Sequence, residues 1–517
     1  MTEPRVPAPN DPAPTPVPSP GAPEADEAHG VRHALRSPRR LKTEALAGLV
    51  VALALIPEAI SFSIIAGVDP RLGLFASVTM AVTIAIVGGR PAMISAATGA
   101  VALVVAPIAR EHGVDYLIAT VILAGLLQIV LGVIGVAKLM RFIPRQVMVG
   151  FVNALAILIF LAQIPHLVEV PWLVYPLTVA GIILLVALPR LTQVVPAPLV
   201  TIVVLTIVVV VAGVRVPTVG DQGDLPDSLP SLLIPNVPWT WETLRLIGPY
   251  AFAMALVGII ESLLTAKLVD DVTDTHSNKT RETWGQGVAN VVTGFFGGMG
   301  GCAMIGQTMI NVKVSGARTR ISTFLAGIFL LILVVGLGDI VGLIPMAALV
   351  AVMIMVSIGT MDWHSVDPRT LRRMPLSETA VMAGTVIVTV ATGNLAYGVL
   401  VGVVVAALLF VRRVAHFTSV TRLDASDADD ERVYAVEGEL FFASSNDLVY
   451  QFDYSGDPKN IVIDMSRAHL WDASTVAALD AVSRKYRARG KHVTIVGMNP
   501  DSTSRYDRLA GKLGEGD

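Results

Sequence analysis

The chain has 517 residues, of which 53% are hydrophobic and 15% are charged, and its formal net charge is −3. Soluble domains carry about 25% charged residues, so the composition favours a membrane protein. The slightly negative net charge excludes a nucleic-acid partner that depends on a basic surface. The single cysteine, Cys302, excludes an internal disulfide and a thiol metal site, and we expect it to be a small space-filling residue.

The composition changes along the chain and indicates four parts. Residues 1–35 are rich in proline and poor in bulky apolar residues, so we expect disorder and no signal peptide. Residues 36–416 are predicted to form a membrane domain. Residues 417–431 form an acidic linker, and residues 432–517 alternate strand-like with helix-like segments, which predicts a small α/β domain.

The predicted membrane domain contains fourteen apolar segments long enough to cross a hydrocarbon layer of roughly 30 Å. They begin near Leu41, Leu72, Ile94, Tyr116, Ile143, Trp172, Ala197, Leu244, Thr283, Met304, Ile321, Ile340, Ser377 and Leu395. Basic residues precede the first segment and follow every even-numbered one, as is typical of cytoplasmic loops. We therefore expect a multi-pass protein of the cell inner membrane with both termini in the cytoplasm.

Two acidic residues interrupt apolar segments. Glu58 follows Pro57 in "LALIPEAISFSIIAGV", and Glu261 lies in "VGIIESLLTAK". A charged side chain at the centre of a membrane helix costs roughly 2.5–3.5 kcal/mol on insertion scales, so each acid is a candidate functional residue. Phe62 shares a helical face with Glu58, so we expect the two to line one substrate-binding pocket.

Each acid also has a structural interpretation. Glu58 could pair with an arginine at the membrane edge, and Glu261 could cap the backbone of a broken helix. Lys267, Asp270 and Asp271 lie at the cytoplasmic end of the segment that contains Glu261, where we expect them to be solvated.

Two glycine-rich stretches suggest an internal duplication. "GGRPAMISAATG" (88–99) opens the third segment of the first half, and "GGMGGCAMIGQT" (297–308) opens the third segment of the second half. Seven spans per half would invert the second half relative to the first. Each stretch predicts a broken helix, extended at first and helical only partway across the membrane.

Two such helix N-termini that meet at mid-membrane form an anion site without a basic residue, because their first N–H groups are unpaired. The predicted donors are the backbone near Ala96, Ala97, Thr98 and Gly99, and near Gly306, Gln307, Thr308 and Met309. Thr98, Gln307 and Thr308 can add side-chain hydrogen bonds.

At these residues the chain resembles the sulfate permease family, the bacterial relatives of the solute-carrier anion exchangers. The resemblance rests on "IPEAISFSIIAGVDPRLGLFAS", on "ALVGIIESLLTAKLVDD" followed by "RETWGQGVANVVTGFFGG", and on "NIVIDMSRAHLWDASTVAAL". The last stretch is similar to the sulfate-transporter and anti-sigma-antagonist (STAS) domain. The resemblance implies an all-α membrane domain of fourteen spans, built as a seven-plus-seven inverted repeat and divided into a core and a gate. It also implies dimers and the transport of small anions such as sulfate, bicarbonate, halides or dicarboxylates.

Three positions depart from the family pattern. Glu58 stands where glutamine is usual, and "IGQT" (305–308) lacks the arginine that many relatives carry there. Ala473 follows Asp472 where relatives with a phospho-switch carry serine, and Ser474 comes one residue later. We therefore expect no phosphorylation switch at this turn.

The sequence thus predicts a secondary transporter that couples protons to a small anion, with a dicarboxylate or bicarbonate favoured over sulfate. Glu58 or Glu261 would carry the proton, because an acid in the site repels an anion when ionised and not when protonated. The sequence contains no motif typical of an enzyme, a metal site or a cofactor site, so we expect no enzymatic activity and no cofactor. An uncoupled exchanger or channel on the same fold, and a membrane-anchored regulatory protein acting through the C-terminal domain, remain the alternatives.

Overall fold

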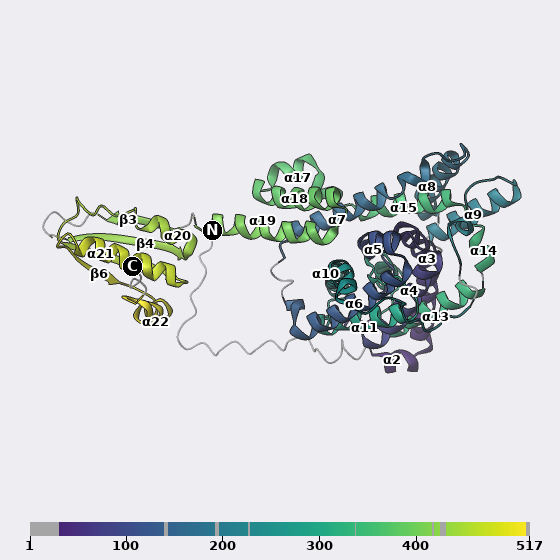
Figure 1. Cartoon of the computed structure of the whole chain (residues 1–517), viewed down its shortest axis with the longest axis horizontal. Helices are drawn as coiled ribbons and strands as arrows, with labels where there is room; N and C mark the ends of the chain where they lie inside the picture. Colours follow the sequence, from purple (N-terminus) through teal and green to yellow (C-terminus); the bar gives the residue numbers. More distant parts are fainter. Residues whose placement is uncertain are drawn as a thin grey trace, which may run out of the picture. The chain divides into compact units, whose positions relative to one another are not determined.

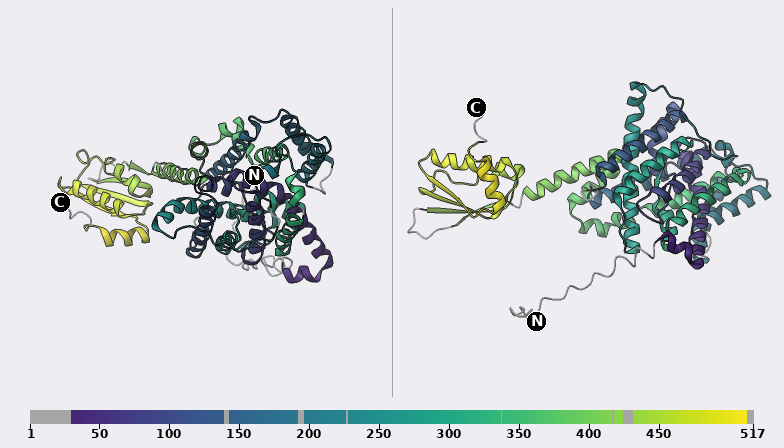
Figure 2. Two further views of the ribbon diagram at one scale, coloured as in Figure 1. Left: turned by 45° about the vertical axis from the view of Figure 1, so that its right-hand side comes forward. Right: turned by 90° about the horizontal axis from the view of Figure 1, so that it is seen from below.

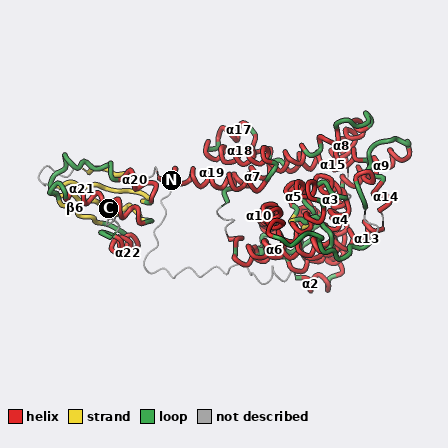
Figure 3. Tube along the Cα trace, viewed as in Figure 1, coloured by secondary structure: helices red, strands yellow, loops and turns green. Residues whose placement is uncertain are grey.

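The computed structural model describes residues 30–138, 143–191, 196–225, 228–336, 338–415, 418–423 and 431–512 (Figure 1). The chain divides into two units. The first lies within Met1–Met374 and Met382–Val401, and the second comprises Pro375–Val381 and Gly402–Asp517. Figure 3 shows that the first unit is almost wholly helical, whereas the second contains a sheet.

A helix lies at each of the fourteen predicted apolar segments. Up to α11 the helices are α2 (Val31–Arg36), α3 (Pro38–Ala66), α4 (Pro70–Val87), α5 (Gly99–His112), α6 (Val114–Ile134), α7 (Arg145–Leu161), η2 (Ile164–Leu167), α8 (Val174–Leu191), α9 (Ala197–Val211), η3 (Val219–Gln222), α10 (Trp241–Thr273) and α11 (Lys279–Phe295). They continue with α12 (Ile305–Met309), η4 (Ile310–Val314), α13 (Arg320–Gly336), α14 (Gly338–Gly342), α15 (Met346–Thr360), α16 (Trp363–Val366), α17 (Pro368–Arg373), α18 (Leu376–Thr392) and α19 (Leu395–Ala415).

Six helices in the described residues are long and apolar enough to cross a membrane: Pro38–Ala66, Pro70–Val87, Val114–Ile134, Arg145–Leu167, Trp241–Thr273 and Leu395–Val414. Shorter apolar helices cover Val174–Arg190, Ala197–Val211, Arg320–Gly336, Met346–Thr360 and Leu376–Thr392. The prediction of a polytopic helical membrane domain is confirmed in this form. The count of fourteen spans stays a prediction, since several helices fall short of the roughly 20 residues that a spanning helix needs.

The helices of the first unit pack in two groups (Figures 1 and 2). One group holds α3, α4, α5, α6, α10, α11 and α13, and the other holds α7, α8, α9 and α15. The groups meet where α3 packs against α9 and α15 and where α5 packs against α7. This division matches the expected core and gate, so we use those two names for the groups.

Inside the core, the two glycine-rich stretches run extended and pair with each other. Strands β1 (Ser95–Ala96) and β2 (Cys302–Ala303) are antiparallel, with Ser95 opposite Ala303 and Ala96 opposite Cys302. Helix α5 begins directly after β1, and α12 directly after β2. The two predicted broken helices are confirmed, and the sequence did not reveal that their extended parts form a sheet.

Side chains of the core complete the hydrogen bonding of this two-stranded sheet, both strands of which are fully buried. Asn290 Nδ2 donates to the Gly301 carbonyl at 3.0 Å, and the Gly301 N–H donates back to Asn290 Oδ1 at 2.9 Å. The Ala303 N–H donates to Ser262 Oγ at 3.1 Å. A Cβ atom on Gly301 would lie 2.0 Å from the Ala96 carbonyl oxygen, so only glycine allows the two strands to approach this closely.

The second unit contains a four-stranded sheet in the order β3–β4–β5–β6, formed by β3 (Ser419–Leu423), β4 (Glu431–Leu440), β5 (Asn460–Leu470) and β6 (His492–Val496). Strand β3 pairs antiparallel to β4, and the other pairs are parallel. Helix α20 (Phe442–Leu448) joins β4 to β5, α21 (Ala473–Arg487) joins β5 to β6, and α22 (Pro500–Leu509) follows β6. The predicted α/β domain is confirmed.

Two predicted parts fall largely outside the described residues. These are most of the proline-rich N-terminus, at residues 1–29, and most of the acidic linker, at residues 417 and 424–430. Within that predicted linker, Ser419–Leu423 form β3 instead, because they pair with β4. The last residues of the first part, from Val31 onward, belong to α2.

Candidate functional site

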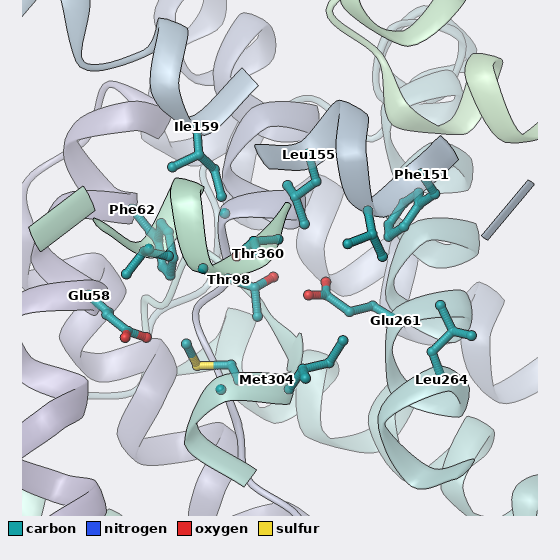
Figure 4. Close-up of a pocket in the computed structure, with 16 residues that line it drawn as sticks. Glu58, Phe62, Thr98, Phe151, Leu155, Ile159, Glu261, Leu264, Met304 and Thr360 are labelled. Atoms are coloured by element: carbon teal, nitrogen blue, oxygen red, sulfur yellow. The ribbon is translucent and has the colours of Figure 1, made fainter. Parts of the chain in front are cut away.

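A pocket of about 430 Å³ lies between the core and the gate (Figure 4). The core contributes Glu58, Phe62, Thr98, Gly99, Glu261, Leu264, Met304, Ile305 and Gly306. The gate contributes Phe151, Val152, Leu155, Ile159, Val356, Gly359 and Thr360. Every ionisable side chain in this lining therefore belongs to the core, and the gate supplies a wall that is almost entirely apolar.

The structure brings six of the predicted site residues to the pocket: Glu58, Phe62, Thr98, Gly99, Glu261 and Gly306. The other five predicted residues are not among those that line it. Ala96 lies in β1, and the Ala97 N–H donates to Ser77 Oγ at 3.2 Å. Thr308 Oγ1 accepts a hydrogen bond from the Ile94 N–H at 3.0 Å, and Met309 packs against a small buried apolar cluster. These groups serve the fold of the broken helices.

Gln307, the fifth of these residues, reaches the pocket through Glu58. Its Nε2 donates to Glu58 Oε1 at 2.9 Å, which joins α12 to α3. Its Oε1 is buried and has no hydrogen-bond partner among the described residues. Glu58 has no arginine partner in the pocket lining, so its structural interpretation as an ion-pair residue finds no support here.

Glu261 is linked through sulfur to the start of α5. Cys302 Sγ donates to Glu261 Oε2 at 2.8 Å, and Cys302 Sγ lies 3.1 Å from Thr98 Oγ1. Figure 4 shows Thr98 between the two acids, with both carboxyl groups toward the pocket. The prediction that Cys302 only fills space is wrong, because its thiol bridges two residues that line the pocket.

The neighbour of Glu261 performs the alternative role considered for that acid. Ser262 Oγ accepts the Ala303 N–H, so Ser262 rather than Glu261 holds the backbone of the broken helix. Thr265 Oγ1 donates to the Glu261 carbonyl at 2.8 Å within α10. The carboxyl group of Glu261 thereby stays available to the thiol and the pocket.

The two broken helices present different surfaces to the pocket. Thr98 is the N-cap of α5, where its Oγ1 accepts the Val101 N–H at 3.3 Å. A Cβ atom on Gly99 would lie 3.0 Å from Phe62 and 3.1 Å from Ile159, so the backbone there is closely covered. A Cβ atom on Gly306 would meet no atom of the described residues within 4 Å, so α12 faces open space there.

An ion-pair cluster lies at the end of α10 and outside the pocket. Arg90 Nη1 lies 3.2 Å from Asp270 Oδ1, and Lys279 Nζ contacts Asp270 Oδ2. The Arg90 side chain is 5% exposed and that of Asp270 is 14% exposed. The expectation that Asp270 is solvated is therefore wrong. Arg90 was not among the predicted site residues, although an arginine inside the glycine-rich stretch "GGRPAM" is a signal in the sequence.

Glu282, in the first turn of α11, positions the first glycine-rich stretch. Glu282 Oε2 accepts the N–H groups of Gly89 at 2.7 Å and Arg90 at 3.0 Å. Glu282 Oε1 accepts a hydrogen bond from Gln286 Nε2 at 2.8 Å, and Gln286 Nε2 also donates to Ser95 Oγ in β1. These contacts fix the strand from which α5 begins. Among the described residues no group of three or more His, Cys, Asp or Glu side chains is placed to hold a metal ion.

Comparisons with known families cover most of the chain. Residues 41–178 and 168–385 match the Sulfate permease family, and residues 422–510 match the STAS domain.

The alignments to individual relatives cover almost the full length of both proteins. The chain is 50% identical over 472 residues to the putative sulfate transporter YbaR of Bacillus subtilis, which covers 91% of this chain and 97% of the relative. It is 25% identical over 529 residues to the bicarbonate transporter BicA of Picosynechococcus sp., with 91% of each chain covered.

Solved structures share the fold at lower sequence identity. The transmembrane domain of a cyanobacterial bicarbonate transporter BicA aligns with a TM-score of 0.62 and 24% identity, covering 72% of this chain and 98% of that one. The murine anion transporter Slc26a9 in its inward-facing state aligns with a TM-score of 0.77 and 17% identity, covering 92% of this chain and 88% of that one.

Proposed function

This chain belongs to the sulfate permease family of multi-pass membrane anion transporters, and on that premise we propose that it is a proton-coupled symporter of a small anion. The observation that carries the proposal is the position of Glu58 and Glu261. Both acids line one pocket between the core and the gate, beside the N-terminus of α5.

The chemistry of the pocket supports binding of an anion together with a proton. The N-terminus of a helix favours negative charge because its first N–H groups are unpaired and its dipole is positive there. An ionised carboxylate beside the same site repels an anion, and protonation removes that repulsion. Proton and anion then increase each other's affinity, and this reciprocal linkage is the thermodynamic basis of symport.

The lining also bears on the anion. Among the described residues that surround the pocket there is no lysine or arginine, so the site offers dipolar donors and no fixed positive charge. Such a site suits bicarbonate or a protonatable dicarboxylate better than a divalent anion that stays fully ionised. Both sulfate and bicarbonate occur in the names of the relatives.

Alternating access follows from where the pocket lies. Its polar residues belong to the core, and its apolar wall belongs to the gate. A displacement of the core against the gate would expose the acids to one side of the membrane and then to the other. We further propose that the protein works as a homodimer in the cell inner membrane with both termini in the cytoplasm, the orientation favoured by the basic residues after the even-numbered segments.

Uptake into proteoliposomes tests this function. Purified protein is reconstituted, and radiolabelled bicarbonate, succinate, sulfate and chloride are supplied in turn, first as counterflow at equal pH and then with the outside acidified. We expect at least one of these anions to be taken up and its accumulation to rise on acidification. Counterflow that is indifferent to the pH gradient would instead identify an uncoupled exchanger on the same fold.

A further inference from the structure

We propose that Cys302 transmits the protonation state of Glu261 to the anion, by deciding whether the hydroxyl hydrogen of Thr98 is available to the pocket. The inference rests on the proposed function, since it concerns how the proton and the anion are coupled in that pocket. It assigns Cys302 as a positioning residue, which acts on the anion through Thr98.

The geometry is a continuous chain of three polar side chains. Glu261 Oε2 lies 2.8 Å from Cys302 Sγ, and Cys302 Sγ lies 3.1 Å from Thr98 Oγ1. Glu261 and Thr98 both line the pocket, whereas Cys302 is fully buried behind them in β2. This series of hydrogen-bonded side chains therefore begins and ends at the pocket lining, and its middle member is buried in the protein.

The hydrogen bonds among these three side chains have two possible arrangements, because each donor has a single hydrogen. A threonine hydroxyl has one hydrogen to donate, and a thiol has one. Oγ1 of Thr98 already accepts the Val101 N–H as the cap of α5, which fixes the oxygen and leaves its own hydrogen as the variable.

With Glu261 ionised, its carboxylate can only accept, so the thiol donates to it and the sulfur is free to accept from Thr98. The hydroxyl hydrogen of Thr98 is then directed at sulfur and away from the pocket. With Glu261 protonated, the acid donates to the sulfur, and the thiol hydrogen turns toward Thr98 Oγ1. The hydroxyl hydrogen of Thr98 must then rotate away from the sulfur, and it turns toward the pocket that Thr98 lines.

Only hydrogen positions change in this relay. The proton binds at the Glu261 carboxylate and stays there, the S–H and O–H bonds rotate, and no bond to sulfur is made or broken. The result is one extra hydrogen-bond donor for an anion when Glu261 carries a proton.

The neighbouring charged groups leave this relay undisturbed. In the pocket lining, the titratable side chain besides Glu261 is Glu58, across the pocket on α3. On the helices packed against α10, the charged residues lie near helix ends: Arg110, Glu111 and His112 in α5, Asp115 in α6, and Lys279, Arg281 and Glu282 in α11. On α10 itself they are Glu242, Arg245, Lys267, Asp270 and Asp271. None of these residues lines the pocket.

Infrared difference spectroscopy tests the relay directly, because Cys302 is the only cysteine of the chain and its S–H stretching band is therefore unambiguous. In the full-length protein we expect acidification to shift this band, since the thiol exchanges a carboxylate acceptor for a hydroxyl acceptor. Glu261→Gln should remove the pH response, whereas Glu58→Gln should retain it. A band that ignores pH, or one that still responds to pH in Glu261→Gln, would overturn the proposal.

The pair Cys302→Ala and Cys302→Ser tests the consequence for the anion. Apparent affinity is measured at a high and a low pH for sulfate, succinate and bicarbonate, whichever of them the wild-type protein takes up. Serine keeps one donor and the acceptor, so Cys302→Ser should keep the gain in affinity on acidification. Cys302→Ala should shrink that gain by about tenfold, the effect of one hydrogen bond to a charged group.

A merely structural role of Cys302 would lower the affinity of Cys302→Ala equally at both pH values, and this result would contradict the relay. The relay and the proposed function also fail separately. A responsive S–H band in a protein whose uptake ignores the pH gradient would refute proton coupling alone, and acid-driven uptake with an unresponsive band would refute the relay alone.

Discussion

Gln307 Nε2 donates a hydrogen bond to Glu58 Oε1 at 2.9 Å, so one of the two pocket acids is tied to the first turn of the second broken helix. The other acid, Glu261, is tied through Cys302 to the cap of the first. Each broken helix is thereby linked to one carboxyl group. This arrangement connects the two acids to the first turns of both broken helices.

The first prediction concerns Glu58 as a proton carrier. Glu58→Gln keeps the size of the side chain and an oxygen that accepts from Gln307, but it cannot be ionised. We expect the variant to bind and exchange the anion, because an amide does not repel it. Accumulation driven by external acidification should fall well below that of wild type, because Glu261 is then the one acid of the pocket lining left to titrate. Uptake into proteoliposomes with and without a pH gradient measures this.

Glu261→Gln is the matched control for this experiment, since it removes the other acid of the same pocket. Loss of acid-driven accumulation in Glu261→Gln alone would transfer the role of carrier to Glu261. A Glu58→Gln transporter that concentrates the anion on acidification as strongly as wild type would end the assignment to Glu58.

The second prediction locates the anion between α5 and α12. A Cβ atom on Gly306 enters open space in the pocket, with nothing within 4 Å. We therefore expect Gly306→Leu to fold normally and to occupy the volume of the anion, lowering uptake at least tenfold with an unchanged thermal unfolding temperature. Gly384 in α18 is also open to a Cβ atom and lies outside the lining, so Gly384→Leu is the control. Full uptake by Gly306→Leu would place the anion elsewhere.

The third prediction concerns the ion pair that supports the first broken helix. Breaking a buried pair leaves one charge uncompensated and costs about 3–5 kcal/mol. Asp270 keeps Lys279 as a second partner, so we expect Arg90→Ala to lower the free energy of unfolding by about 3 kcal/mol. Thermal unfolding of the purified protein measures this loss.

The double variant Arg90→Ala with Asp270→Ala completes the cycle for that pair. It should be less destabilised than the sum of the two single variants, because neither charge is left without its partner. Additive effects would show that the contact between Arg90 and Asp270 contributes nothing of its own.

The fourth prediction concerns the C-terminal domain. Ser474 is exposed in the first turn of α21, whose N-cap is Asp472. A carboxylate there lies near the positive end of the helix and should stabilise it slightly, by about 0.3–1 kcal/mol. We expect Ser474→Asp, as a substitute for a phosphoserine, to leave the initial rate of uptake within twofold of wild type. A several-fold change would mean that the turn is a phosphorylation switch displaced by one residue.

Composition and local pattern were sufficient for much of this structure. Repeated apolar segments predicted the helices. Glu58 and Glu261 were predicted site residues because a charged side chain inside an apolar segment costs free energy, and both line the pocket. The glycine-rich stretches predicted both broken helices, because glycine and proline before a short apolar run oppose a continuous helix.

The contacts that the sequence did not predict are those between distant residues of small or ordinary type. Cys302 and Thr98 are 204 positions apart, and a single cysteine is usually an apolar filler. Arg90 and Asp270 stood near segment ends, where solvation is the usual outcome, and only the folded core shows that they meet. The antiparallel register of β1 and β2 likewise follows from packing, since two residues are too few to carry a strand pattern.

The most direct test of the account is accumulation of the transported anion by the wild-type protein at steady state. Proteoliposomes are held at zero membrane potential, with the outside either at the internal pH or one unit more acidic. We expect acidification to raise the internal anion concentration above the external one, and a protonophore to abolish the excess. Equal concentrations on both sides at both pH values, with transport otherwise intact, would contradict proton coupling.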